Sequence, residues 1–236
     1  MSATDTRGIL LPILGLAVAS AIACSSVAAQ EACHAPPLRE FLEAQRQRLR
    51  YEGVFFPTPE ADSLVVVTRS GPMLWLAARW NDFEDGALFA LRCNNTVLGV
   101  TRPGGINRIV RQPLPDSEIN AVAVQITPGR GNGIERREMA IYGMIGGHLT
   151  RLFLSATFHR ESAIAPDSGF LVKREVMISP RGDSIVVRGT TRVIVPVGDT
   201  GSRLGPERAL PTERLCWSPI GRVYRRCPFV ARKPPG

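Results

Sequence analysis

The chain has 236 residues, 21% of them charged, and a formal net charge of +8. This length provides for one sizeable domain or two small ones. The positive charge suggests nucleic acid, but the aromatic residues do not interleave with the arginines as a base-stacking surface requires. A nucleic-acid partner is therefore not expected.

Arginine supplies nearly all of the positive charge, since Lys173 and Lys233 are the only two lysines. The planar guanidinium group suits carboxylates and phosphates, which favours an anionic partner. A GC-rich genome would also enrich the chain in arginine, glycine, alanine and proline. Because the arginines are dispersed along the chain rather than grouped in a stripe, genome composition is the favoured explanation.

Residues 1–29 have the pattern of a secretory signal peptide. Arg7 precedes an apolar run over residues 8–23, and small residues follow as far as Ala29. The run is shorter than the roughly 20 apolar residues that span a bilayer, so the mature chain, residues 30–236, is expected to have no transmembrane helix. In an alternative interpretation, "AIAC" is a bacterial lipoprotein box and Cys24 is acylated as a membrane anchor. The favoured cut after Ala29 predicts an exported protein, periplasmic or secreted.

Four cysteines remain in the mature chain, an even number that is typical of disulfide pairing in an oxidising compartment. In "CWSPIGRVYRRC", Gly221-Arg222 is typical of a two-residue type II′ hairpin turn, which places Cys216 directly opposite Cys227. Facing residues of a hairpin are close enough for a disulfide. A Cys33–Cys93 pair follows by elimination.

The remaining pattern predicts one helix followed by many strands. Residues 36–50 place apolar side chains on one helical face, including Phe41, Leu42 and Leu49. The predicted strands are 63–69, 73–80, 87–93, 96–101, 120–127, 137–144, 148–158, 170–178 and 184–197, followed by the final hairpin. Residues 197–213 are expected to be a loop, and residues 230–236 a disordered tail.

No helical pattern interrupts the strands, so βαβ units and a parallel sheet are not expected. We therefore predict a single, mainly β domain over residues 30–236. Its strands form an antiparallel meander in a sandwich or barrel, and the one N-terminal helix, in residues 30–51, packs on it.

The sharpest motif is Arg181-Gly182-Asp183, the tripeptide that integrin-type receptors read on adhesive proteins. We predict that Gly182-Asp183 forms a two-residue turn. The apolar residues of 170–178 and 185–195 then share one face of a hairpin, on which Arg174 is the one charged exception. The motif is thereby explained as a turn, and adhesion through it remains an alternative.

Candidate catalytic groups are few. His159 and Glu161 share a strand face and form a possible base–carboxylate pair, with Asp167 near them in sequence. His148 lies eleven positions from His159 on the same predicted strand and points to the opposite face. The sequence contains no nucleophile elbow, P-loop or zinc-protease motif.

Neither a cofactor nor a metal site is predicted. No C-x-x-C pair exists, so a zinc site is not expected. Asp82, Glu84 and Asp85 are candidates for binding Ca²⁺, but their spacing differs from the EF-hand pattern, and a bare acidic turn is favoured.

These observations predict a non-catalytic binding or structural protein of the cell envelope or exterior. Its expected partner is an anionic envelope polymer, a lipid headgroup or another protein. The candidate binding residues lie in the final hairpin: Arg222, Tyr224, Arg225 and Arg226. A secreted enzyme built around His159 and Glu161 is the main alternative.

Overall fold

The computed structural model describes residues 33–55, 58–68, 71–80, 85–110, 120–131, 134–161, 169–198 and 201–228. The predictions for the signal peptide, Cys24, Asp82, Glu84, Asp167 and the tail at 230–236 lie outside the described residues. Strands make up 66% of the structure and helix 7%, and the sheets are antiparallel. The predicted fold class is confirmed.

The N-terminal helix is divided in two. Helix α2 spans Leu38–Ala44 and helix α3 spans Arg46–Leu49, with the break at Gln45. Arg50 ends α3 in the left-handed conformation, with φ of 51°. Phe41, Leu42 and Leu49 are buried as the helical periodicity predicts.

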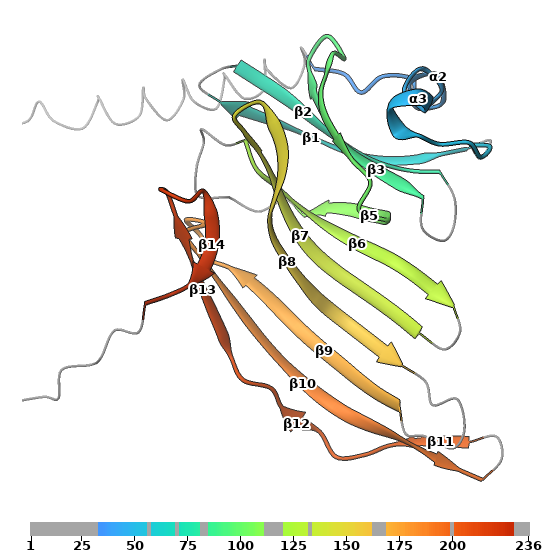
Figure 1. Ribbon diagram of the computed structural model, residues 1–236, viewed down its shortest axis with the longest axis vertical. Helices are drawn as coiled ribbons and strands as arrows, with labels where there is room; N and C mark the ends of the chain where they lie inside the picture. Colours follow the sequence, from blue (N-terminus) through green and yellow to red (C-terminus); the bar gives the residue numbers. More distant parts are fainter. Residues whose placement is uncertain are drawn as a thin grey trace, which may run out of the picture.

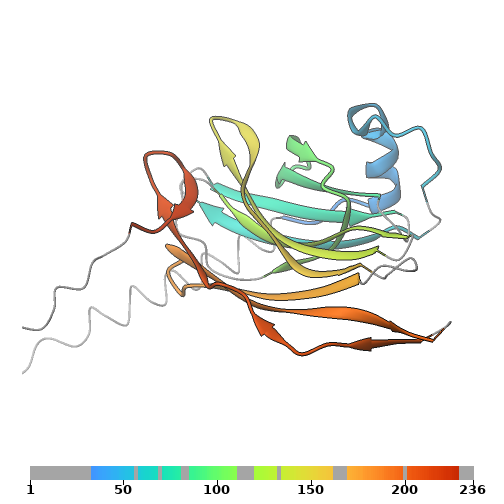
Figure 2. The ribbon, with the colours of Figure 1, turned by 60° about the horizontal axis from the view of Figure 1, so that its bottom comes forward.

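A four-stranded antiparallel meander forms the middle layer of the molecule. Its strands are β1 (Glu60–Thr68), β2 (Gly71–Arg79), β3 (Gly86–Arg92) and β4 (Val97–Thr101), paired in chain order. Alternate residues of β2 and β3 contact the helices on one face and the larger sheet on the other (Figure 2). Burial on both faces explains why β2 and β3 are continuous apolar runs rather than alternating ones.

The larger sheet has ten strands. Its main path runs β14-β13-β10-β9-β8-β7-β6-β5, and β11 and β12 pair with β10. The strands are β5 (Gly105–Val110), β6 (Val122–Gly131), β7 (Ile134–Ile145), β8 (His148–Glu161), β9 (Gly169–Ile178), β10 (Ser184–Val197), β11 (Gly201–Leu204), β12 (Arg208–Ala209), β13 (Glu213–Ser218) and β14 (Val223–Arg226). The sequence did not predict β5, and β11 and β12 lie in the segment that was expected to be a loop.

The two sheets form a sandwich-like arrangement and not a closed barrel, which decides the alternative that the sequence left open. The β5–β7 end of the larger sheet packs on the small sheet around Trp75, Val124 and Tyr142. The β9–β12 end extends past the small sheet along the long axis (Figure 1). None of the helices in the described part of the chain is long and apolar enough to cross a bilayer.

A fork in the larger sheet separates β8 from β9. These strands pair only where Phe158–Glu161 meets Phe170–Lys173, although β8 continues back to His148. The hairpin of β13 and β14 covers the fork, and Phe153 of β8, Val187 of β10 and Tyr224 of β14 share one hydrophobic core there.

Both predicted disulfides are present. Cys33 and Cys93 have Cα atoms 4.4 Å apart, and those of Cys216 and Cys227 are 4.9 Å apart. Cys33–Cys93 therefore ties the segment before α2 to the residue that follows β3. Cys216–Cys227 closes the terminal hairpin, and the pair indicates an oxidising compartment.

The predicted turn of the terminal hairpin is wrong, although its disulfide is right. Ser218 pairs with Val223 and Cys216 with Arg225, so four residues form the loop and Cys227 is a diagonal neighbour of Cys216. Arg222, not Gly221, has a positive φ, 47°. A type II′ turn requires positive φ at its first central residue, which Gly221 does not have here.

The Arg-Gly-Asp hairpin also has a longer loop than the predicted two-residue turn. Ile178 pairs with Ile185 and Val176 with Val187, and the amide of Gly182 donates to the carbonyl of Ser179 at 2.8 Å. Compared with the prediction, the register is displaced by two residues. Because side chains alternate with a period of two, this displacement keeps the predicted faces.

Candidate ligand-binding groove

A groove of about 440 Å³ lies at the fork between β8 and β9. This volume is within the usual range of ligand pockets. It is lined by Arg136, Leu152, Phe153, Leu154, Ser155, Ala156, Arg174, Val187, Glu213, Leu215 and Tyr224. Aliphatic and aromatic side chains form much of the lining, and three charged side chains lie among them.

The cross-strand register places the charged and apolar residues on one face of the sheet. Directly opposite residues of paired strands share a face. Val187 lies opposite Val176 and Glu213, and Gly189 lies opposite Arg174. The face that is closed by the terminal hairpin therefore continues through Arg174 towards the open end of the sheet.

The two arginines of the groove differ in their partners. A guanidinium nitrogen of Arg136 lies 2.5 Å from Oε1 of Glu138, a carboxylate that is almost completely buried. Arg174 is half-buried and makes no ion pair or side-chain hydrogen bond with any residue that the structure describes. Arg174 can therefore bind an incoming anion without breaking an existing contact.

Tyr224 forms the wall of the groove on the hairpin side. Its hydroxyl donates to the carbonyl of Gly182 at 2.6 Å, and its ring centroid is 6.3 Å from that of Phe153 and 5.2 Å from that of Trp217. Burial, followed by the nearby carboxylate of Asp183, raises the pKa of the Tyr224 phenol above its ordinary value. Tyr224 is therefore a neutral hydrogen-bond donor throughout the physiological range of pH.

The Arg-Gly-Asp turn lies behind this wall and is bound into the fold. Asp183 accepts hydrogen bonds from the hydroxyls of Ser179 at 2.6 Å and Ser184 at 3.3 Å, and the Ser179 bond is the largest cause of its lowered pKa. The backbone carbonyl of Asp183 accepts from the amide of Trp217 at 2.8 Å. Gly182 is buried, whereas Arg181 and Asp183 on either side of it are exposed.

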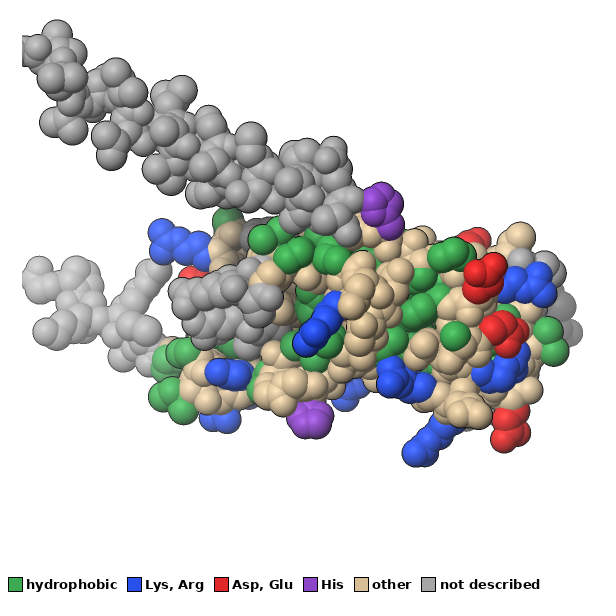
Figure 3. Space-filling view, turned by 90° about the horizontal axis from the view of Figure 1, so that it is seen from above, with side chains coloured by type: hydrophobic (Ala, Val, Ile, Leu, Met, Phe, Trp, Pro, Cys, Tyr) green, Lys and Arg blue, Asp and Glu red, His purple; other side chains and the backbone are tan. Residues whose placement is uncertain are grey.

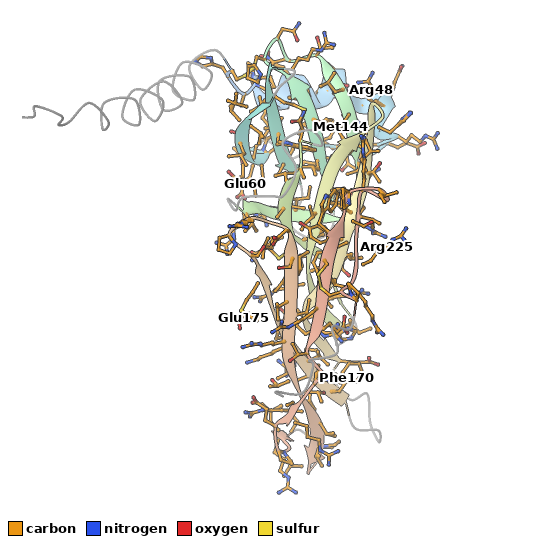
Figure 4. All side chains as sticks on the ribbon, turned by 90° about the vertical axis from the view of Figure 1, so that its left-hand side faces the viewer. Arg48, Glu60, Met144, Phe170, Glu175 and Arg225 are labelled. Carbon is orange, nitrogen blue, oxygen red and sulfur yellow. A yellow bond between two sulfur atoms is a disulfide. The ribbon has the colours of Figure 1, made fainter. Side chains whose placement is uncertain are left out.

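The proposed catalytic pair lies towards the open end of the same face. Nε2 of His159 is 3.7 Å from Oε2 of Glu161, and the imidazole stacks on Phe170 with centroids 5.0 Å apart. That nitrogen has no hydrogen-bond partner among the described residues. No hydroxyl or thiol in the described part of the chain is hydrogen-bonded to His159. Figure 4 shows Phe170 near one end of the long axis and Arg48 near the other.

The predicted binding residues of the terminal hairpin are divided by the structure. Tyr224 is buried in the groove wall, whereas Arg222, Arg225 and Arg226 are exposed on the hairpin. Basic and acidic side chains are scattered over the helix-bearing end of the molecule rather than gathered in a stripe (Figure 3). The groove gathers apolar and charged side chains in one concave site and is therefore the better candidate site.

Of the predicted metal-binding triad, only Asp85 is described. One of its carboxylate oxygens accepts a hydrogen bond from Arg102 at 2.9 Å. Within the described ranges, no group of three or more histidine, cysteine or acidic side chains is placed to hold a metal ion.

Sequence reasoning missed Arg136, Ser155 and Glu213 as groove residues, because they come from strands that are distant in the chain. The sequence carried one signal for the groove: Arg174 is the charged residue on an otherwise apolar strand face. Comparisons with family models, with curated proteins and with solved structures find no match.

Proposed function

We propose that this protein is an exported, non-catalytic binding protein that holds an anionic partner in the groove between β8 and β9. The signal-peptide pattern and the two disulfides support export to the periplasm or the cell exterior. The partner is a component of the cell envelope or its surroundings: an anionic polymer, a lipid headgroup or another protein.

The observation that carries the proposal is the unpaired guanidinium of Arg174 in a groove that polar and apolar side chains line together. A half-buried arginine is partly desolvated, so its attraction for a carboxylate or phosphate is stronger than that of an exposed arginine. Val187, Leu215 and Phe153 add apolar surface for the rest of the ligand. A few polar groups placed among apolar ones are the usual composition of a binding pocket.

Two substitutions test the proposal. Binding of the mature, disulfide-bonded protein is measured against polygalacturonate, poly-glutamate and vesicles that contain an anionic lipid, with dextran and zwitterionic vesicles as neutral references. Arg174→Ala is expected to weaken binding to the preferred anion by about tenfold or more, because a charged hydrogen bond contributes about 1.5–3 kcal/mol.

Arg188→Ala is the matched control. Arg188 is exposed on β10, next to Gly189, the residue opposite Arg174, and lies opposite Glu175. The Arg188→Ala substitution also removes one positive charge, but from the opposite face of the sheet. The affinity for the anion should therefore be unchanged. Equal losses in the two variants, or no binding to any of the anions, would contradict the proposal.

The enzyme alternative has less support. His159 and Glu161 are partly exposed, but Nε2 of His159 is buried, and neither side chain contacts a nucleophile or a metal-binding group in the described residues. For the adhesion alternative, Arg181 and Asp183 are exposed, but the Asp183 carboxylate already accepts a hydrogen bond from Ser179 and the carbonyl of Gly182 accepts one from Tyr224.

A further inference from the structure

We infer that the groove receives an extended polypeptide segment, which adds as a strand to the free edge of β8 and places a carboxylate against Arg174. The inference rests on the proposed function, since it names the partner class of the same groove. The shape of the sheet at the fork carries it.

The first observation is the unpaired edge of β8. This strand pairs with β7 along its whole length, from His148 to Glu161, but with β9 only from Phe158 onwards. Between Leu149 and Thr157, alternate residues direct their amide and carbonyl groups away from β7. In the described structure, no backbone group bonds to them from that side. Such an edge is a template for pairing with another chain.

The second observation is that this edge lies in the groove. Five consecutive residues of β8, Leu152 to Ala156, line it. A strand whose face lines a groove contributes only alternate residues to the lining. A strand whose edge lines the groove contributes consecutive residues. The five residues span about 16 Å, the length of an added segment of about five residues.

The opposite wall of the groove is also the edge of a strand. β14 is the last strand of the larger sheet, so no further strand of the described chain pairs with its outer side. The terminal hairpin lies beside β8 (Figure 1). The groove thus lies between the edge of β8 and the side of the terminal hairpin that carries Tyr224.

The edge of β5 is partly protected. At the far end, the amide of Ile109 in β5 donates to a carboxylate oxygen of Asp62 at 2.8 Å. Across the fork, β9 faces β8, and from Arg174 to Ile178 its edge on that side is likewise unpaired within the described chain, while its other edge pairs with β10. The edge of β8 is distinguished by the five consecutive residues that line the groove.

Charge and shape then specify the segment. One set of its alternate side chains faces Val187 and Leu215 on the floor of the groove, and these are apolar. The floor also holds Arg174, so one side chain of that set is acidic. The amide groups of β8 match the repeat of a peptide backbone, which an anionic polysaccharide lacks, and a peptide is therefore favoured.

The test uses a fluorescently labelled hexapeptide of alternating valine and threonine in which one valine is replaced by glutamate, capped at both ends. Its affinity for the mature protein is measured by fluorescence anisotropy. Binding is expected, with a loss of about tenfold or more for Arg174→Ala and no loss for Arg188→Ala.

Two N-methylated versions of this peptide identify the mode of binding without altering the protein. Each carries N-methyl groups on one of the two alternating sets of amides. If the peptide adds as a strand to β8, methylation of the amides that face β8 should abolish binding. Methylation of the other amides, which face away from β8, should leave most of the affinity. Equal affinity of both versions would overturn the inference.

A further result separates this inference from the proposed function. If polygalacturonate or anionic vesicles bind in an Arg174-dependent manner and the peptide does not, the groove binds an anion but not a strand, and the inference is lost. If no anion binds, both are lost. Slower amide hydrogen exchange at residues 152–156 on addition of the peptide would support strand addition directly.

Discussion

Tyr224 connects three parts of the molecule through one side chain. Its ring packs against Phe153 of β8 and Trp217 of β13, and its hydroxyl bonds to the carbonyl of Gly182. The sequence marked Tyr224 as a binding residue because of the arginines beside it. The structure places it between the Arg-Gly-Asp turn and the groove, so its first role is to hold the turn and the hairpin together.

We predict that Tyr224→Phe lowers the free energy of unfolding by about 1–2 kcal/mol, because the buried carbonyl of Gly182 loses its donor while the ring contacts remain. Urea denaturation with the disulfides intact measures the change. Tyr51→Phe is the matched control, since the Tyr51 hydroxyl bonds to the carbonyl of Val54 at an exposed position, and a change within about 0.5 kcal/mol is expected. An equal loss in both variants would contradict the assignment.

The same residue predicts the dependence of stability on alkaline pH. Its pKa in the folded state is raised, so the unfolded chain releases the phenolic proton at lower pH. Stability is therefore full below about pH 10, the ordinary pKa of tyrosine, and declines as pH rises from there towards the folded pKa. Tyr224→Phe should decline less steeply over this range in denaturation curves at increasing pH. Burial also raises the pKa of Tyr142, so part of the slope should remain in the variant.

At the scale of elements, the terminal hairpin decides whether the groove exists. β13 pairs with β10 through Ser184–Val187, and β14 is held only by β13 and by the contacts of its side chains. The Cys216–Cys227 disulfide closes this short unit, whereas Cys33–Cys93 anchors the chain near the helices, away from the groove. The two bridges therefore have different expected effects on binding.

We predict that replacing Cys216 and Cys227 by serine lowers the free energy of unfolding by about 3 kcal/mol and also weakens binding in the groove. Replacing Cys33 and Cys93 should lower stability more, by about 4 kcal/mol, because that bridge closes a longer loop, but should leave the affinity of the folded fraction unchanged. Urea denaturation and anisotropy on each variant separate the two effects. Unchanged affinity in the hairpin variant would show that the groove does not depend on this bridge.

At the scale of the whole molecule, burial is concentrated at one end. β2 and β3 are covered by the helices on one face and the larger sheet on the other, and β6 and β7 have buried residues on both faces of the sheet. β11 and β12, in contrast, consist of exposed residues, and Phe170 and Val193, which lie opposite each other, are both partly exposed. The molecule thus has a dense three-layered end and a thin end of single sheet.

We predict that amide hydrogen exchange follows this division. The amides of β2, β3, β6 and β7 should exchange only through global unfolding, while those of β11, β12 and the distal part of β10 exchange through local opening. Exchange measured by mass spectrometry on peptide fragments reports both groups in one experiment. Comparable protection at the two ends would show that the thin end is covered in solution.

Most of the strands were predictable because they carry a local signal. Turn residues bound the apolar runs, and the boundaries of β9 and β10 agree with the sequence pattern to within one residue. β5 was missed because it is short and follows β4 after a short turn, and β11 and β12 were missed because their residues are polar and exposed. Hairpin loops were predicted two residues too short, since Gly-X and Gly-Asp suggest tight turns that the native register does not use.

The sequence by itself determined the class of fold and the helix with its buried face, and it predicted the right pairs of cysteines although the register of the terminal hairpin was wrong. These follow from periodicity and from spacing along the chain, which are local properties. Only the tertiary structure decided between sandwich and barrel, split β8 from β9, and brought Arg136, Arg174, Glu213 and Tyr224 around one groove. Those outcomes depend on the twist of the sheet and on packing between strands far apart in the chain, for which no short segment carries a signal.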